Sequence, residues 1–218
     1  MPAGPVPRSF FARPSLTVAR DLLGCVLFVV RDGGRVAVRL TEVEAYDGES
    51  DPGSHAFRGQ TPRNTVMYGE AGHLYVYFTY GMHYCANVVT GRPGQASAVL
   101  LRAGEVVGGA DLAAGRRPSA RMSRDLARGP ARLAQSLGLG RADNGVDLCG
   151  APSSGPDGPA QWVERGRRGD RALVRTGPRV GVSGLGGDAA TYPWRLWVDA
   201  DPTVSPYRPA KPRARRNV

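Results

Sequence analysis

The feature that most constrains the fold of this chain is a pair of β-type runs joined by a tight-turn signal. Residues 25–30 are almost continuously apolar, and residues 35–46 begin by alternating apolar and polar side chains. The Asp32-Gly33-Gly34 sequence between them is typical of a hairpin turn, because glycine and aspartate tolerate the backbone conformations that such turns need. The two runs therefore predict an antiparallel hairpin, which commits the N-terminal part of the chain to a sheet.

Further strand and helix signals follow along the chain. The run at residues 74–80 is the strongest, Gly81 interrupts it, and residues 84–89 predict the returning strand. Additional strands are expected at residues 98–103, 171–176, 179–183 and 194–199. Short helices are expected near residues 15–23, 61–64, 108–114, 122–128 and 130–137. Ser15 or Thr17 would cap the first of these helices.

The order of these elements predicts an α+β fold. Strands come first and in clusters, and helices are inserted later. We therefore expect a single domain with a curved, mainly antiparallel β-sheet and flanking short helices. The domain is expected over residues 15–205, between an irregular segment at 1–14 and a basic, disordered tail at 206–218. Residues 138–170, rich in Gly, Asp, Ser, Pro and Arg, are expected to form surface loops.

The charge of the chain is strongly one-sided. Its formal net charge is +10, and 28 of its 29 basic residues are arginine, with Lys211 the single lysine. This balance indicates a polyanionic partner, and arginine suits phosphate because its planar fork donates parallel hydrogen bonds. No apolar run reaches the roughly 18 residues of a membrane span, and no signal-peptide core is present. We therefore expect no membrane partner and a cytoplasmic location, at the nucleoid if the source is bacterial.

The cysteines and histidines do not predict a metal site. Cys25, Cys85 and Cys149 are scattered, odd in number and without CxxC spacing, and only three histidines could join them. Reduced thiols are the simpler interpretation, because a structural zinc site needs closely spaced Cys and His ligands. We expect neither a metal nor a cofactor.

Two glutamates lie at the end of the second β-type run. The apolar residues Val36, Val38 and Leu40 have even residue numbers and so share one face of the strand, whereas the apolar Val43 has an odd number. A core-facing Val43 therefore requires a β-bulge or a strand end near residues 41–42, and bulges often lie beside active sites. Glu42 or Glu44 would then point to the other face. An isolated strand glutamate is, however, more often solvated than catalytic.

The strand at residues 74–80 carries an unusual number of aromatic side chains. Alternation places Tyr75 and Tyr77 on one face and Phe78 and Tyr80 on the other. We expect Tyr75 and Phe78 to pack in the core. Tyr80 precedes Gly81 at a turn, where a core aromatic is less expected. In a basic protein, such a tyrosine can enter a duplex as a wedge between base steps.

Taken together, these segments resemble the 3-methyladenine (alkyladenine) DNA glycosylase family. They are, in order, Glu42-Val-Glu44-Ala-Tyr46, His55, Gln60-Thr-Pro-Arg-Asn64, Gly72-x-Leu-Tyr-Val-Tyr77-x-x-Tyr80-Gly-Met82, Asn87 and Leu100-Leu-Arg102-Ala103. The later segments Arg128-Gly-Pro-Ala-Arg132-Leu and Pro178-Arg-Val-Gly181 also fit. The resemblance spans about residues 10–205. Its most specific part is residues 41–103, because many separately placed polar residues match there in order.

The resemblance implies a reaction centre and a base pocket. Glu44 would activate the water that attacks the anomeric carbon, and Arg102 would lie near that water. The side chains expected to hold and select the damaged base are Tyr46, His55, Tyr77 and Asn87. His55, taken alone in its glycine-rich loop, is more often a packing residue.

The resemblance also implies contacts with DNA. Tyr80, with Met82 beside it, would fill the gap that the displaced base leaves in the duplex. Arg63 and Arg132 would contact the DNA backbone. The expected partner is double-stranded DNA containing damaged purines, the expected state is a monomer, and no cofactor is implied.

The residue types fit this chemistry. Breaking an N-glycosidic bond builds positive charge on the sugar, and one carboxylate can both polarise water and stabilise that cation. The nucleotide must first leave the duplex and enter a stacking pocket. Aromatic rings favour a cationic alkylated base over a neutral one by about 1–2 kcal/mol for each good contact in a desolvated site.

The sequence therefore predicts a monofunctional DNA glycosylase that flips out alkylated or deaminated purines, hydrolyses the N-glycosidic bond and so starts base excision repair. A lyase-type enzyme would need an amine, and both Lys211 and Pro2 lie in segments expected to be unstructured. A zinc deaminase is excluded, because the HxE and PCxxC motifs are absent. The alternative is a non-catalytic damaged-DNA or RNA binding module, in which Glu44 would only repel phosphate.

Overall fold

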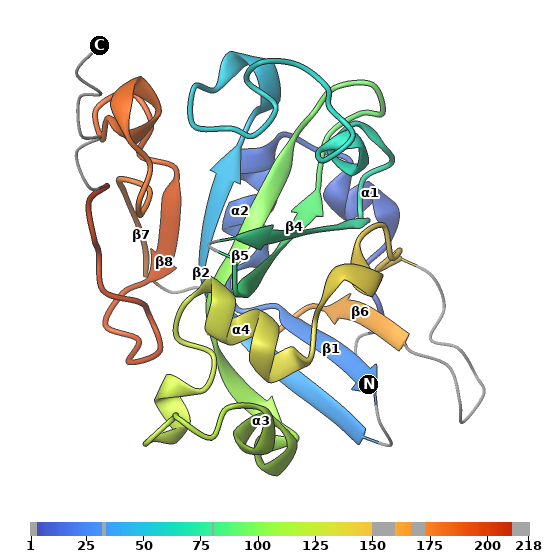
Figure 1. The fold of residues 1–218 in the computed structure, drawn as a ribbon, viewed down its shortest axis with the longest axis vertical. Helices are drawn as coiled ribbons and strands as arrows, with labels where there is room; N and C mark the ends of the chain where they lie inside the picture. Colours follow the sequence, from blue (N-terminus) through green and yellow to red (C-terminus); the bar gives the residue numbers. More distant parts are fainter. Residues whose placement is uncertain (1–3, 32–33, 80, 150–159, 167–172, 211–218) are drawn as a thin grey trace.

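The structure is a computed structural model that describes residues 4–31, 34–79, 81–149, 160–166 and 173–210. In this part of the chain, eight strands form one open antiparallel sheet with four short helices around it (Figure 1). The strands are β1 (Val26–Arg31), β2 (Gly34–Tyr46), β3 (Leu74–Thr79), β4 (His83–Val89), β5 (Ala98–Gly108), β6 (Ala160–Glu164), β7 (Val174–Gly177) and β8 (Arg195–Val198). The helices are α1 (Arg8–Phe11), α2 (Ser15–Leu22), α3 (Ala110–Arg116) and α4 (Pro130–Leu137). The predicted single-domain α+β class is confirmed.

The long strand β2 is the branch point of the sheet. The main strand order is β3-β4-β5-β2-β1-β6, and the β7–β8 hairpin joins β2 outside that path. Residues 34–39 of β2 pair with β1, whereas residues 42–44 pair with β8. On its other edge, β2 pairs with β5, and the register shifts between Leu40 and Val43. The predicted bulge near residues 41–42 is confirmed, and it lies where the partner of β2 changes from β1 to β8.

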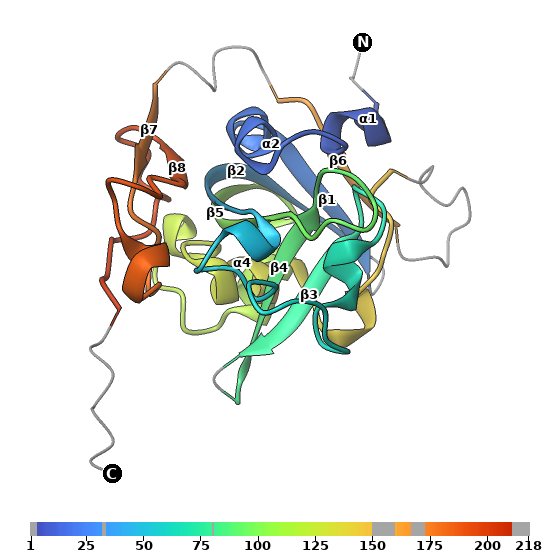
Figure 2. The same ribbon diagram turned by 90° about the horizontal axis from the view of Figure 1, so that it is seen from above.

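The helices cover opposite sides of the sheet (Figure 2). Helix α2 packs on β2 and β5, and helix α4 packs on β4 and β5 from the other side. Each helix buries its apolar side chains, Val18 and Leu22 on α2 and Leu133 and Leu137 on α4. Burying each such side chain stabilises the fold by about 1.5–3 kcal/mol. Helix packing therefore holds β2 and β5 in place, and these are the strands that carry the predicted reaction centre.

Several strand predictions are corrected. Residues 138–170 were expected as loops, but residues 160–164 form the edge strand β6, which pairs with β1. Residues 179–183 were expected as a strand and form an irregular segment instead. Tyr75 is buried as predicted, whereas Phe78 is 42% exposed, because its face of β3 turns outward near the hairpin end. The two hairpins predicted from residues 25–46 and 74–89 are confirmed.

The helices also differ from expectation at their starts. The segment at residues 1–14 is not irregular throughout, because it contains α1, whose Phe10 and Phe11 are buried. Helix α2 begins directly after Pro14, and neither Ser15 nor Thr17 caps it. The helices predicted near 61–64 and 122–128 are 3₁₀ turns at Thr65–Tyr68 and Ser123–Asp125.

Some predictions fall on residues that the structure does not describe. They concern the Asp32-Gly33 turn, Pro2, Tyr80, residues 150–159, the start of the strand predicted at 171–176, and the tail from Lys211 onward. Within the described ranges, no helix combines the length and apolar character needed to cross a bilayer.

Candidate active site

A cavity of about 350 Å³ opens where β2, β3, β4 and β5 lie side by side. The side chains predicted for catalysis and base binding all line it: Glu44, Tyr46, His55, Tyr77, Asn87 and Arg102. The sheet register explains how distant segments meet, because Leu100 of β5 pairs with Glu44 on one side and with Asn87 on the other. Two loops, residues 52–55 and 180–183, complete the wall.

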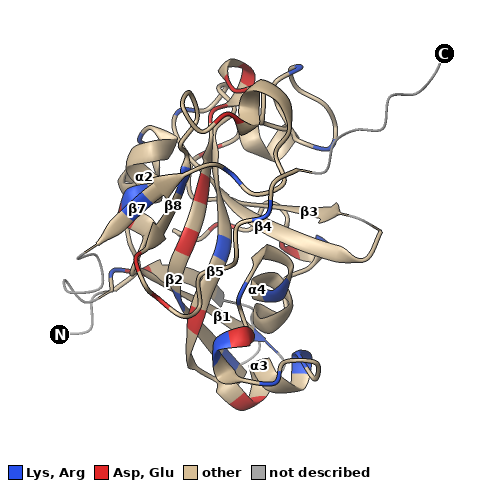
Figure 3. Ribbon diagram, turned by 90° about the vertical axis from the view of Figure 1, so that its left-hand side faces the viewer, with Lys and Arg blue, Asp and Glu red and all other residues tan. Residues whose placement is uncertain are grey.

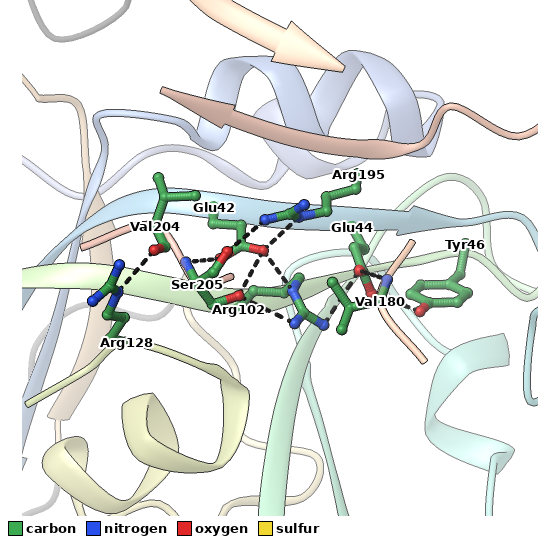
Figure 4. A network of polar contacts seen from close by, with 9 residues as sticks. All are labelled: Glu42, Glu44, Tyr46, Arg102, Arg128, Val180, Arg195, Val204 and Ser205. Atoms are coloured by element: carbon green, nitrogen blue, oxygen red, sulfur yellow. Dashed lines mark hydrogen bonds and ion pairs between the residues drawn. The ribbon is translucent and has the colours of Figure 1, made fainter. Parts of the chain in front are cut away.

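Glu44 lines this cavity, and its carboxylate is held at both oxygens (Figure 4). Its Oε1 accepts a hydrogen bond from the Val180 backbone N–H at 2.7 Å and lies 3.2 Å from Arg102 Nη1. Its Oε2 accepts a hydrogen bond from the Tyr46 hydroxyl at 2.8 Å. The side chain is fully buried, so the orientation of the carboxylate is fixed before any ligand arrives.

Arg102 joins Glu44 to a second buried carboxylate, Glu42. Arg102 Nε donates to Glu42 Oε1 at 2.9 Å, while Nη1 faces Glu44. Figure 3 shows the acidic positions of β2 beside the basic position of β5. Desolvation alone would lower the pKa of Arg102, but the two carboxylates outweigh it and the pKa is raised. Glu42 is buried, not solvated as expected for an isolated strand glutamate.

Aromatic rings form one wall of the cavity. The His55 ring meets the Tyr77 ring edge to face, with centroids 4.6 Å apart, and Tyr75 and Tyr77 lie 5.5 Å apart. His55 Nδ1 lies 3.2 Å from the Tyr75 hydroxyl, which fixes the imidazole orientation. This wall offers the flat, apolar surfaces against which a planar heterocycle stacks.

The wall is electrically neutral at neutral pH. Desolvation, assisted by the nearby Arg63, lowers the pKa of His55. Desolvation also raises the pKa of Tyr77 well above its ordinary value. For Tyr46, desolvation and the Glu44 charge both raise the pKa. The Glu44 carboxylate therefore provides the negative charge in this part of the cavity.

Two polar groups on β4 face the same space. Asn87 is buried, and its Nδ2 donates to the Tyr75 carbonyl at 3.0 Å. The amide plane is thereby fixed, and within the described part of the structure its Oδ1 makes no hydrogen bond. Cys85 lies beside Tyr77, and desolvation raises the pKa of its thiol, which keeps it neutral.

Three of the residues predicted to contact DNA, Arg63, Met82 and Arg132, are described, and none of them lines the cavity. Met82 is 69% exposed at the β3–β4 turn, as an intercalating side chain would be. Arg63 is exposed, and its guanidinium carbon lies 5.6 Å from the Tyr77 ring centroid. Arg132 is exposed on α4. Tyr80 lies outside the described residues, so its role stays a prediction.

The structure adds a residue pair that the sequence analysis did not single out. Arg179 and Asp51 are fully buried and form two hydrogen bonds, at 2.5 and 2.6 Å. Arg179 also donates to the Ala45 and Gly186 carbonyls and lies over the Tyr46 ring, 4.5 Å from its centroid. It therefore fixes Tyr46 and the segment that presents the Val180 N–H. The Pro178-Arg-Val-Gly181 match signalled this segment, but not its partner Asp51.

The described residues contain no group of three or more His, Cys, Asp or Glu side chains arranged to hold a metal ion.

Comparison with known proteins identifies the family. Residues 9–202 match the methylpurine-DNA glycosylase family. The chain belongs to this family. The match covers every residue of the cavity, and it confirms the resemblance inferred from the sequence motifs.

The relatives match over nearly their whole length. A protein of Streptomyces avermitilis is 58% identical over 212 residues, which cover 97% of this chain and 96% of the relative. A protein of Leifsonia xyli is 55% identical over 206 residues, covering 92% of each chain. One of Methanocella arvoryzae is 44% identical over 208 residues, covering 94% of this chain and 97% of the relative. Each is provisionally named a 3-methyladenine DNA glycosylase.

The chain is therefore a DNA glycosylase, a hydrolase that acts on N-glycosyl bonds, and its substrate is DNA. This membership favours the enzyme over the non-catalytic binding module that the sequence left as an alternative.

Proposed function

We propose that this glycosylase removes alkylated or deaminated purines from double-stranded DNA by a monofunctional route, in which Glu44 activates a water molecule. The observation that carries the proposal is the Glu44 carboxylate, fully buried under an aromatic cavity and held at both oxygens. A binding site alone would have no need of a preoriented anion in a basic protein.

The Glu44 contacts suit a general base. Each carboxylate oxygen can accept two hydrogen bonds. Oε2 has Tyr46 as a donor and so can accept a second hydrogen bond from water. As the base departs, positive charge grows on the sugar, and the nearby anion stabilises that charge while it takes the proton of the attacking water. Arg102 and the Val180 N–H hold the carboxylate in place during this step.

The neutral aromatic wall suits a damaged purine. An imidazolium at His55 would repel a cationic alkylated base, and the lowered pKa of His55 avoids this. The rings of Tyr46 and Tyr77 then stack on the base, and each good contact favours a cationic ring by about 1–2 kcal/mol. The cavity, at about 350 Å³, lies at the lower end of the range for small-molecule sites, about 300–1,000 Å³, and so suits a single base.

Selection against normal purines is assigned to Asn87. Its amide is fixed by the Tyr75 carbonyl, so a purine substituent meets a group that cannot rotate away without losing that hydrogen bond. Leaving such a buried donor unpaired costs about 1–3 kcal/mol.

A base reaches this cavity only after leaving the duplex. We propose that the β3–β4 turn, with the exposed Met82, enters the space that the base vacates, and that Arg63 and Arg132 contact the phosphates. The wedge role of Tyr80 is carried by the family resemblance. We propose further that the protein acts as a monomer.

The proposal is tested by measuring free-base release from duplexes that each carry one lesion: 7-methylguanine, hypoxanthine, ethenoadenine or 3-methyladenine. At least one of these bases should be released, and borohydride should trap no covalent protein–DNA adduct, because hydrolysis by water forms no imine. Release of no purine from any duplex would contradict the substrate class. A trapped adduct would contradict the monofunctional route.

A further inference from the structure

The buried carboxylate Glu42 lies on β2 two residues before Glu44, and Arg102 contacts both carboxylates (Figure 4). Its Oε1 accepts hydrogen bonds from Arg102 Nε at 2.9 Å, Arg195 Nε at 2.7 Å and the Ser205 hydroxyl at 3.0 Å. Its Oε2 accepts the Ser205 N–H at 2.8 Å. Glu42, Arg195 and Ser205 are all absent from the described lining of the cavity. Glu42 therefore touches no substrate there.

Glu42 remains ionised in this environment. Desolvation, the largest single effect, raises the pKa of its carboxyl, but Arg102, Arg195 and the two hydrogen bonds from Ser205 together outweigh it and lower the pKa. A charged group without a substrate contact, buried at this depth, needs a reason, because a buried ion pair often stabilises a fold no better than apolar packing.

The charges of the cluster balance. Glu42 and Glu44 are two anions, and Arg102 and Arg195 are two cations, with Arg102 shared between the two carboxylates. Arg179 also acts on Glu44, and its own charge is matched by a carboxylate to which it makes two hydrogen bonds.

In the described part of the structure, three further titratable groups close to Glu44 are neutral. They are Tyr46 on β2, Tyr77 on β3 and Cys85 on β4, and each has a raised pKa, to which desolvation contributes most. The charge that Glu44 presents to the cavity therefore depends on how strongly Arg102 is drawn away from it.

The C-terminal segment completes the cluster. Thr203 bonds to Thr41 of β2 at 2.8 Å, and the Val204 carbonyl accepts a hydrogen bond from Arg128 at 2.9 Å. These two contacts place Ser205 against Glu42. The segment thus reaches β2 at its bulge, where β8 also brings in Arg195.

We propose that Glu42 is a positioning residue for the reaction, holding Arg102 in place and balancing its charge, so that the Glu44 carboxylate stays available to water. This inference rests on the proposed role of Glu44 as the base. Without the Glu42 charge, Arg102 would turn fully to Glu44, and one uncompensated cation would oppose the positive charge that grows on the sugar.

The test is single-turnover base release with saturating enzyme, together with the Kd for a lesion duplex, in Glu42→Gln. The chemical rate should fall roughly 10- to 100-fold, the range seen when residues that orient the ligands of a metal are removed. The Kd should change less than about threefold, because Glu42 does not line the cavity.

Two further variants separate charge from packing. In Glu42→Gln with Arg195→Gln, one anion and one cation are removed, so the balance returns and the chemical rate should recover at least severalfold over Glu42→Gln alone. Asp143→Asn is the matched control, because Asp143 is a buried carboxylate that pairs with Arg31 outside the cavity. Its chemical rate should stay within about twofold of the wild type.

The outcomes are distinct. Recovery in the double variant supports the proposal. Three results would overturn it: a double variant whose chemical rate is no higher than that of Glu42→Gln, a weaker lesion Kd that explains the whole loss of activity in Glu42→Gln, or an equal loss of rate in Asp143→Asn. Glu44→Gln serves as the benchmark, since excision that survives in it defeats the proposed function itself, whatever Glu42 does.

Folding of the variants is checked by circular dichroism. If Glu42→Gln does not fold, Ser205→Ala decides, because it removes the hydroxyl that donates to Glu42 at 3.0 Å and accepts from Arg102 Nη2 at 3.4 Å, while it leaves the charges of both residues in place. A severalfold slower chemical step at unchanged Kd supports the proposal, and an unchanged rate overturns it.

Discussion

Replacing Asp51 by alanine should destabilise the protein far more than a typical ion-pair mutation. Asp51 and Arg179 have no exposed side-chain surface, and their two hydrogen bonds are 2.5 and 2.6 Å long. Among the described residues, Asp51→Ala leaves the buried Arg179 guanidinium with the Ala45 and Gly186 carbonyls as its hydrogen-bond acceptors. Removing one partner of a buried ion pair costs about 3–5 kcal/mol, because the remaining charge stays desolvated.

That cost converts to a large thermal shift. In a domain of this size, 1 kcal/mol lowers Tm by about 2–4 °C, so Asp51→Ala should lower Tm by about 6–20 °C. The assay is thermal unfolding followed by circular dichroism at pH 7.

The control is Asp199→Ala, because Asp199 pairs with Arg175 on the surface at 3.1 Å, where the arginine side chain is 62% exposed. An exposed pair contributes about 0–1 kcal/mol, so the control should lose less than about 4 °C. An Asp51→Ala protein within about 2 °C of the wild type, or a control that loses as much, would refute the reasoning about burial.

Three further predictions follow from the site. Glu42 has a lowered pKa in the folded state, so its contribution to stability is complete above its unfolded pKa, about 4.3, and is lost as pH falls through the lowered value. Between pH 6 and pH 3, the free energy of unfolding measured in urea should therefore fall less in Glu42→Gln than in the wild type. Tyr77→Ala should weaken binding to a duplex with a cationic lesion about tenfold and leave the affinity for undamaged DNA unchanged, as measured by fluorescence anisotropy. Arg132→Ala should reduce the slope of log K against log salt by about 0.9 on damaged and undamaged duplexes alike, and an unchanged slope would remove Arg132 from the phosphate contacts.

The sequence predicted the parts of the fold that local patterns determine. The hairpin strands at 25–46 and 74–89 alternate clearly, and the parity change at Val43 located the bulge. Strand β6 was missed because it lies in a Gly- and Arg-rich stretch and pairs with β1, more than a hundred residues earlier in the chain. Phe78 was misplaced because alternation assigns faces and cannot tell that β3 leaves the core near its end.

The site was predicted from order and residue type, and its supporting contacts were not. The six predicted residues that line the cavity all belong to the motifs that resemble the family, and the sheet register brings them together. The ionised Glu42 and the Arg179–Asp51 pair depend on contacts across more than a hundred residues. Local periodicity carries no information about such pairs, so Glu42 looked like a solvated carboxylate.

The central claim is that Glu44 acts on water and does not only bind the lesion. It is tested most directly by Glu44→Gln, which keeps the shape of the side chain and removes its charge. Single-turnover release of a damaged base and the Kd for the same lesion duplex should be measured on one preparation. The account predicts that excision falls by at least about 100-fold while the Kd stays within about threefold. A variant that excises the base at the wild-type rate, or one whose whole loss is explained by weaker binding, would contradict it.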